Sequence, residues 1–238
     1  NQDEISLLGD IEINNITFRH GNRHAILDNC SLYIEKGEKV ALIGSCGSGK
    51  STLARLLLRL YIPENGCIKI NGYDIADIPI PQLRRKIAYI PQNNFLFQGS
   101  IIENIKINDS SIEDNEVISF FNNTPIEKYI EQFPAGYYTF LSEGGNNISG
   151  GQKQIIAFAR ALFKHSDIFI LDEATSAVDV SIRQVIEETM QYIKRKVTVI
   201  VITHQLNTIK SYDKIYKIEE GKATRIDIFA NKNGLNEQ

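Results

Sequence analysis

Residues 44–52 have the types and the spacing that binding of a nucleotide phosphate requires. They read Gly-Ser-Cys-Gly-Ser-Gly-Lys-Ser-Thr and fit the pattern GxxxxGK followed by Ser or Thr. The preceding run Lys39–Ile43 predicts a buried strand, and the leucines that follow at helical spacing (Leu53, Leu56, Leu57 and Leu60) predict a helix. Glycines in such a loop turn backbone N–H groups toward phosphate oxygens, and the helix N-terminus adds a partial positive charge.

The side chains of this loop have separate expected roles. The ammonium of Lys50 can reach the β- and γ-phosphates, and the hydroxyl of Ser51 can join the ligands of a Mg²⁺ ion. Cys46 is expected to lie beside the phosphates as a reactive thiol, although it could instead point into the protein as a small filler. The predicted nucleotide-binding residues of the loop are Gly44, Ser45, Cys46, Gly47, Ser48, Gly49, Lys50, Ser51 and Thr52.

Two acidic residues follow a second apolar run. Ile168–Leu171 predicts a strand that is buried on both faces, and Asp172 and Glu173 come directly after it. Taken alone, the acidic pair could equally cap a following helix. Downstream of a phosphate-binding loop, however, Asp172 is expected to face the Mg²⁺ ion and Glu173 to polarise the attacking water.

A third motif reduces the number of protein families that the sequence could belong to. Asn147-Ile148-Ser149-Gly150-Gly151-Gln152 resembles the LSGGQ signature of ATP-binding cassette (ABC) proteins, with Ile148 in place of Leu. It precedes an amphipathic run, Gly151–Phe163, so it predicts a second helix N-terminus able to bind phosphate. The resemblance implies that ATP is held between the loop of one copy and the signature of another. The signature residues are Ser149, Gly150, Gly151 and Gln152.

Other segments of this family occur in the expected order. Gln92 resembles the Q-loop, Asp179 in Ser176–Asp179 the D-loop, and His204 the H-loop. His20 stands at the A-loop position, usually Tyr, where its smaller ring implies weaker stacking on adenine. Ile155 stands where Arg is usual. The resemblance implies the catalytic residues Glu173, His204, Lys50 and Gln92, and the metal ligands Ser51, Gln92 and Asp172.

Two segments resemble the exporter branch of the family, namely Phe95–Ile105 and the X-loop Ser142–Asn147. The nearest resemblance is to the C-terminal ATPase domain of bacterial bacteriocin or peptide exporters. It implies an ATP-hydrolysing motor at the cytoplasmic face of the bacterial membrane. Its implied partners are a transmembrane domain of the same or a partner chain and a second copy of this domain.

Alternatives are export of lipid or drug-like substrates, a non-transport ABC ATPase, and a regulator that binds ATP without turnover. ATPases of DNA repair insert a long coiled coil between Q-loop and signature, for which residues 92–149 leave no room. The simultaneous presence of Glu173 and His204 disfavours the regulator.

Composition is that of an ordinary globular chain of 238 residues, with 42% hydrophobic residues and a net charge of −3. The absence of a basic field argues against nucleic acid as a partner. Three scattered cysteines argue against a zinc site or a disulfide framework. No window is apolar for long enough to span a bilayer. The start Asn-Gln-Asp-Glu, without Met, suggests an excised fragment.

The expected fold is α/β: a P-loop NTPase with a RecA-like core, an antiparallel β subdomain and an ABC-type α-helical subdomain. Residues 1–238 form one domain, in which about 11–90 and 155–228 form the core and about 91–154 the helical subdomain, while 1–10 are a linker. The middle, about 79–136, is expected to be mostly helical. The other expected strands and helices are Ile11–Phe18, Ser31–Ile34, Cys67–Ile70, Ser181–Ile193, Val197–Thr203, Ile215–Glu219 and Thr224–Ile228.

Overall fold

The computed structural model describes residues 5–107, 109–173, 179–193, 196–204 and 211–226. The chain divides into two compact units, each assembled from separate segments. The first unit comprises residues 1–87, 167–173 and 194–238, and the second comprises residues 88–166 and 174–193. Within the described part of the chain, no helix is both long enough and apolar enough to cross a membrane.

An antiparallel sheet forms one layer of the first unit. Its strands, in spatial order, are β2 (Leu27–Ile34), β1 (Ile11–Phe18), β4 (Asn65–Ile70) and β5 (Tyr73–Asp74). Alternate residues of β1 face inward, so that Ile11 and Ile13 are buried while Asn14 is exposed. This sheet therefore has one face in the core, as the alternation in the sequence predicts.

A second sheet carries the parallel strands of the first unit. It contains, in spatial order, β12 (Lys222–Ile226), β11 (Lys214–Glu219), β3 (Lys39–Ile43), β10 (Thr198–Ile202) and β9 (Ile168–Asp172). β3 pairs in parallel with β10 and β11, and β10 pairs in parallel with β9. Every residue of β9 and β10 is buried, so both faces of these strands are covered.

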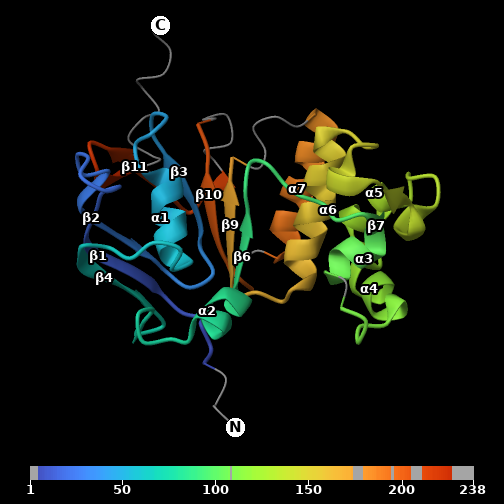
Figure 1. The fold of residues 1–238 in the computed structure, drawn as a ribbon, viewed down its shortest axis with the longest axis horizontal. Helices are drawn as coiled ribbons and strands as arrows, with labels where there is room; N and C mark the ends of the chain where they lie inside the picture. Colours follow the sequence, from blue (N-terminus) through green and yellow to red (C-terminus); the bar gives the residue numbers. More distant parts are fainter. Residues whose placement is uncertain (1–4, 108, 174–178, 194–195, 205–210, 227–238) are drawn as a thin grey trace, which may run out of the picture. The chain divides into compact units, whose positions relative to one another are not determined.

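Helix α1 (Lys50–Leu57) lies between the antiparallel sheet and the parallel strands (Figure 1). Leu53, Leu56 and Leu57 are buried along one side of it, as their spacing predicts. Leu60 is 50% exposed, contrary to the sequence pattern, because the helix ends before it and Arg59 takes a left-handed backbone conformation. Among the described residues, this unit also contains the helix α2 (Ile80–Lys86).

Residues before β1 are attached to the first unit. Leu7 is 1% exposed, and its N–H donates to the carboxylate of Asp167 at 3.2 Å. Asp10 accepts hydrogen bonds from the hydroxyl of Tyr33 and from the N–H of Lys36. This part of the segment expected to be a linker is therefore fixed against the sheet.

The second unit is mainly helical. Its helices are α3 (Ile101–Lys106), α4 (Asp114–Phe121), α5 (Pro125–Ile130), α6 (Gly150–Phe163) and α7 (Val180–Ile193). It also has the short strands β7 (Gly99–Ser100) and β8 (Phe140–Leu141) and the single turns η1 (Gly136–Tyr138) and η2 (Glu143–Gly145). The strand β6 (Ile87–Ile90) interrupts the stretch expected to be helical and spans the boundary at residues 87 and 88.

The second unit is larger than the helical subdomain expected from the sequence. The expected boundary at residues 154 and 155 falls inside α6, which runs without a break from Gly150 to Phe163. Ile155, Ile156 and Phe158 on this helix are fully buried. α6 packs against α3 and α7, so α6 and α7 both belong to the second unit.

Candidate nucleotide-binding site

The phosphate-binding loop joins β3 to α1 and depends on glycine at its first position. Gly44 has a φ of 148°, and a Cβ atom there would lie 2.3 Å from the carbonyl oxygen of Ile218. No other residue fits so close to the backbone of β11. The loop ends at Gly49, which also has a positive φ, and α1 begins at Lys50. The N–H groups of the first turn of α1 therefore open toward the loop.

Lys50 lies inside the curve of this loop. Its ammonium donates to the carbonyl oxygens of Gly44 at 2.9 Å and Ser45 at 2.7 Å, and to the hydroxyl of Ser48 at 3.4 Å. The side chain is buried, at 6% exposed. The loop therefore encloses this positive charge, and its contact with phosphate stays a prediction.

Ser51 and Asp172 meet although they are far apart in the sequence. The hydroxyl of Ser51 donates to the carboxylate of Asp172 at 2.9 Å. Asp172 is the last residue of β9 and is buried, while Ser51 is in the first turn of α1. Two hard oxygen ligands at this distance suit Mg²⁺, which prefers oxygen ligands and completes its shell with phosphates and water.

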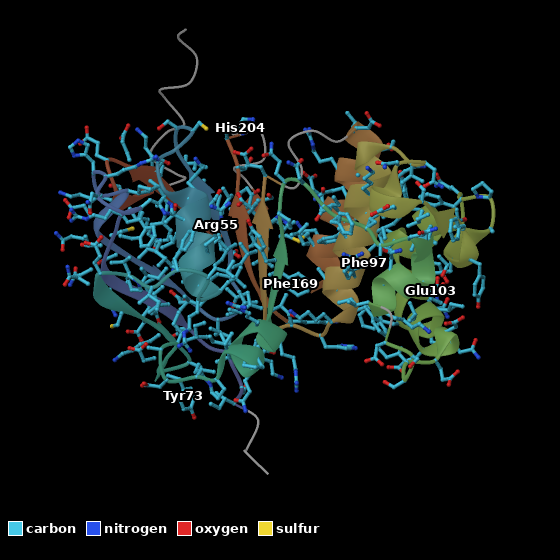
Figure 2. All side chains as sticks on the ribbon, viewed as in Figure 1. Arg55, Tyr73, Phe97, Glu103, Phe169 and His204 are labelled. Atoms are coloured by element: carbon cyan, nitrogen blue, oxygen red, sulfur yellow. The ribbon has the colours of Figure 1, made fainter. Side chains whose placement is uncertain are left out.

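Glu173 and His204 also lie together, where β9 and β10 end. The N–H of Glu173 donates to the carbonyl oxygen of Ile202 at 2.9 Å. The Oε1 atom of Glu173 is 3.7 Å from Nδ1 of His204. Figure 2 shows His204 at the end of the first unit that is opposite to Tyr73. Because the two residues follow neighbouring parallel strands, the sheet brings them to the same edge as Asp172.

The backbone of Glu173 is strained. Its φ is 52°, in the left-handed region that residues other than glycine rarely adopt. Such conformations cost about 1–3 kcal/mol and occur often at functional sites. The position therefore turns sharply out of β9 and directs the carboxylate toward His204.

His20 belongs to a cluster of aromatic rings. Its ring centroid is 4.9 Å from that of Phe18 and 5.0 Å from that of Tyr61, and it is nearly perpendicular to both. Phe18 and Tyr61 are stacked 5.1 Å apart. The sequence predicted a base-stacking role for His20 alone and did not indicate the two rings that hold it.

The signature forms the start of α6, in the second unit. The hydroxyl of Ser149 accepts from the N–H of Gln152 at 3.2 Å, and the side chain of Gln152 accepts from the N–H of Ser149 at 2.9 Å. This reciprocal capping box fixes the helix N-terminus. A Cβ atom on Gly150 would meet no other atom within 4 Å, so this position is open.

Two further predicted residues, Gln92 and Asp179, also lie in the second unit. Gln92 is exposed just after β6, and Asp179 is exposed just before α7. Residues 176–178 of the predicted D-loop lie outside the described residues. The structure thus brings together Lys50 and Ser48, Ser51 and Asp172, and Glu173 and His204, all in the first unit.

A pocket of about 400 Å³ lies in the second unit beside the Q-loop. Its lining includes the exposed rings of Phe95 and Phe97, together with Arg160 and Lys164 from α6 and the residues after it, and none of its lining residues is acidic. Sequence reasoning did not single out Arg160. The available signal was an arginine between apolar residues on a helix whose other face is buried.

The comparisons with known proteins agree with this geometry. The family model described as "ABC transporter" matches residues 27–176. The leukotoxin translocation ATP-binding protein of Mannheimia glucosida is 41% identical over 232 residues, which are 95% of this chain and 33% of that protein. The same protein of Bibersteinia trehalosi matches to the same extent. The chain therefore spans a third of the length of these relatives.

A solved structure has the same fold. The chain of a bacterial Atm1-family ABC exporter with ATP bound matches with a TM-score of 0.84 and 36% identity, over 91% of this chain and 38% of that chain. The matched fold is the ABC type of P-loop NTPase, with its antiparallel β sheet and helical unit. From the phosphate-binding loop, the signature helix and these matches, it follows that the chain belongs to the ABC transporter family.

Proposed function

We propose that the chain is the ATP-hydrolysing motor domain of an ABC exporter. The observation that carries this proposal is the juxtaposition of Glu173 and His204, 3.7 Å apart, at the sheet edge where Asp172 meets Ser51. A site that only binds nucleotide needs the loop and the lysine. A carboxylate next to an imidazole, at the position expected for the terminal phosphate, suits the activation of a water molecule.

The roles of the residues follow from their positions. Lys50 and the amides of α1 bind the phosphates and offset their charge. Glu173 orients the attacking water or accepts its proton, and His204 contacts the γ-phosphate. Gln92 would supply an oxygen ligand to the metal and a contact to the water. Ser149 of a second copy contacts the γ-phosphate through the N-terminus of its α6.

Ser51 and Asp172 would hold Mg²⁺, with Gln92 as a third ligand. The ion would neutralise charge on the β- and γ-phosphates. The fit rests on the oxygen pair already present, at 2.9 Å. Asp172 is buried and accepts a hydrogen bond from the hydroxyl of Ser51.

The proposed cargo is a polypeptide, because relatives at 41% identity translocate leukotoxin. A bacteriocin or another exported peptide fits the same proposal. The motor would work at the cytoplasmic face of the bacterial membrane, attached to a transmembrane domain of the same or a partner chain. The pocket lined by Phe95 and Phe97 is the proposed attachment surface.

The Glu173→Gln variant tests the proposal. It should bind MgATP as the parent does but hydrolyse it at least ~100-fold more slowly, as expected for loss of an acid–base group. Glu220→Gln is the matched control, because Glu220 has a similar φ of 49° and lies in the turn between β11 and β12. Phosphate release and nucleotide binding are measured on both. Parent-like turnover by Glu173→Gln would refute the assignment.

A further inference from the structure

The loop that carries His20 ends against the phosphate-binding loop. The N–H of Ile26 donates to the carbonyl oxygen of Phe18 at 2.8 Å, which closes a loop of residues 19–25. A Cβ atom on Gly49 would lie 2.8 Å from Cδ2 of Leu27 and 3.2 Å from Cγ2 of Ile26. The end of the loop with His20 is therefore anchored beside the last residue before α1.

Two further rings support the imidazole of His20. Phe18 and Tyr61 are parallel to within 16°, whereas the imidazole lies at 88° to the first ring and at 81° to the second. Aromatic rings attract each other in stacked and in edge-to-face arrangements. Phe18 is 7% exposed, while His20 and Tyr61 are half-buried. The imidazole thus has an aromatic support and keeps part of its surface open.

Tyr61 is in turn held from the side of α1. The guanidinium of Arg55 lies 5.9 Å from the centroid of the Tyr61 ring, and its Nη1 donates to the Tyr61 hydroxyl at 3.5 Å. Figure 2 shows Arg55 on α1, whose first residue is Lys50. The helix that begins at the phosphate-binding loop therefore also holds the ring that supports His20.

The two chain segments that carry these rings are joined to each other. The N–H of Glu64 donates to the carbonyl oxygen of Thr17 at 2.8 Å. The carboxylate of Glu64 accepts from Nε of Arg19 at 2.9 and 3.0 Å. Both partners of this ion pair are exposed, so it adds little stability by itself. Its consequence is geometric, because it ties the neighbour of His20 to the segment that contains Tyr61.

An imidazole without such support would keep its rotational freedom and would lose it on stacking against a base, at a cost in affinity. Here the ring has its neighbours before any ligand binds. We propose that Tyr61, which lies outside the motifs, is a positioning residue that orients His20 for stacking on the base of the nucleotide. This inference rests on the proposed function, because it takes the ligand to be a nucleoside triphosphate.

Equilibrium binding to the full-length exporter tests the proposal, with dissociation constants obtained by competition with trinitrophenyl-ATP. Tyr61→Leu should weaken ATP binding about fivefold or more, because the aromatic contacts with His20 are lost. Inorganic tripolyphosphate, which offers phosphates without a base, should bind this variant and the parent equally. Tyr61→Phe keeps the ring and should restore the parental affinity for ATP. In hydrolysis assays, Tyr61→Leu should raise KM for ATP and leave kcat unchanged.

A double-mutant cycle separates positioning from packing. In a His20→Ala background, Tyr61→Leu should cause little further loss of ATP affinity, because Tyr61 acts through the imidazole. Tyr73→Leu is the matched control. Tyr73 is 51% exposed in β5 of the same sheet and lies apart from Arg55 in Figure 2. This variant should bind ATP as the parent does.

Three results would overturn the inference. Parental ATP affinity in Tyr61→Leu would show that the tyrosine has no role in binding. Equal losses of affinity for ATP and for tripolyphosphate would show that it supports the phosphate site and not the base. Additive losses in the double variant would show that it acts without His20. Failure of the proposed function would appear differently, as an exporter whose ATP binding depends on Tyr61 but which does not hydrolyse ATP.

Discussion

At the scale of single residues, chemical labelling of Cys46 tests where the phosphates of a bound nucleotide lie. It is exposed in the loop, whereas Cys30 is fully buried. Burial raises the pKa of the Cys30 thiol to about 11, so this thiol stays protonated and inert at neutral pH. Maleimide should therefore modify Cys46 before Cys30 and abolish ATP hydrolysis, because the adduct occupies the phosphate site. MgATP should protect, as mass spectrometry of labelled peptides will show.

The matched control is Cys46→Ser, which should be active and resistant to maleimide. Cys67 in β4 is partly exposed and serves as an internal reference for labelling that nucleotide does not affect. If Cys46 labels equally with and without MgATP, or if Cys46→Ser is still inactivated, the thiol does not lie beside the phosphates.

At the scale of single residues, the sequence predicted site residues wherever a motif has fixed spacing. It indicated Lys50 and Ser51 because the loop pattern specifies them, and it indicated Asp172 and Glu173 because they end a buried apolar run. It did not indicate Arg160, whose bond to the carbonyl oxygen of Phe95 joins residues 65 positions apart in the chain. No local pattern reports such a contact.

The packing of α6 on α7 makes the two signature glycines unequal. A Cβ atom on Gly151 would lie 2.2 Å from Cδ1 of Ile182, which is 2% exposed in α7, whereas Gly150 is open. Alanine at either position gains helix propensity, but at 151 it also overpacks the contact. Gly151→Ala should therefore be less stable than Gly150→Ala by about 1–2 kcal/mol, as measured by urea unfolding.

Ile182→Val removes the clashing methyl group and provides the control. The double variant Gly151→Ala with Ile182→Val should lose less stability than the sum of the two single variants. Additive losses of stability would mean that the side chain of Ile182 does not clash with an alanine at position 151.

The bond between Tyr33 on β2 and Asp10 gives a pH dependence. The hydroxyl of Tyr33 donates to the carboxylate of Asp10, which raises the pKa of Tyr33 to about 12 and lowers that of Asp10. For the tyrosine, the stabilisation is complete below pH 10, the ordinary pKa, and is lost as pH rises through about 12. Between pH 10 and about pH 12, the melting temperature of Tyr33→Phe should therefore fall less than that of the parent. Parallel profiles would contradict this.

Most elements were predictable because their periodicity is local. β1 and β3 have the bounds that alternation and apolar runs predict, and α6 begins one residue earlier than expected. β6 was missed because its four residues are too few to show a period. The exposed end of α1 was missed because the left-handed turn at Arg59 is not marked by glycine.

For the whole molecule, the predicted homodimer should require nucleotide. In the proposed dimer, the signature of one copy and the phosphate loop of the other would each supply half of an ATP site, and both would present polar surfaces that gain little from contact without phosphate. The 238-residue chain of Glu173→Gln should sediment as a dimer with MgATP and as a monomer with MgADP or without nucleotide. A stable dimer in the absence of nucleotide would show that phosphate is not the bridge.

The strand that carries the phosphate loop takes both of its neighbours from the far end of the chain. β3 pairs with β10 through Lys39 and Val199, and with β11 through Val40 and Lys214. The antiparallel sheet, by contrast, pairs strands that are made early. On the ribosome, the loop is therefore synthesised long before the strands that hold it. The leucines of α1 therefore lack the core of the parallel sheet until β10 and β11 have been synthesised, and during that time they are expected to be exposed apolar surface on the nascent chain.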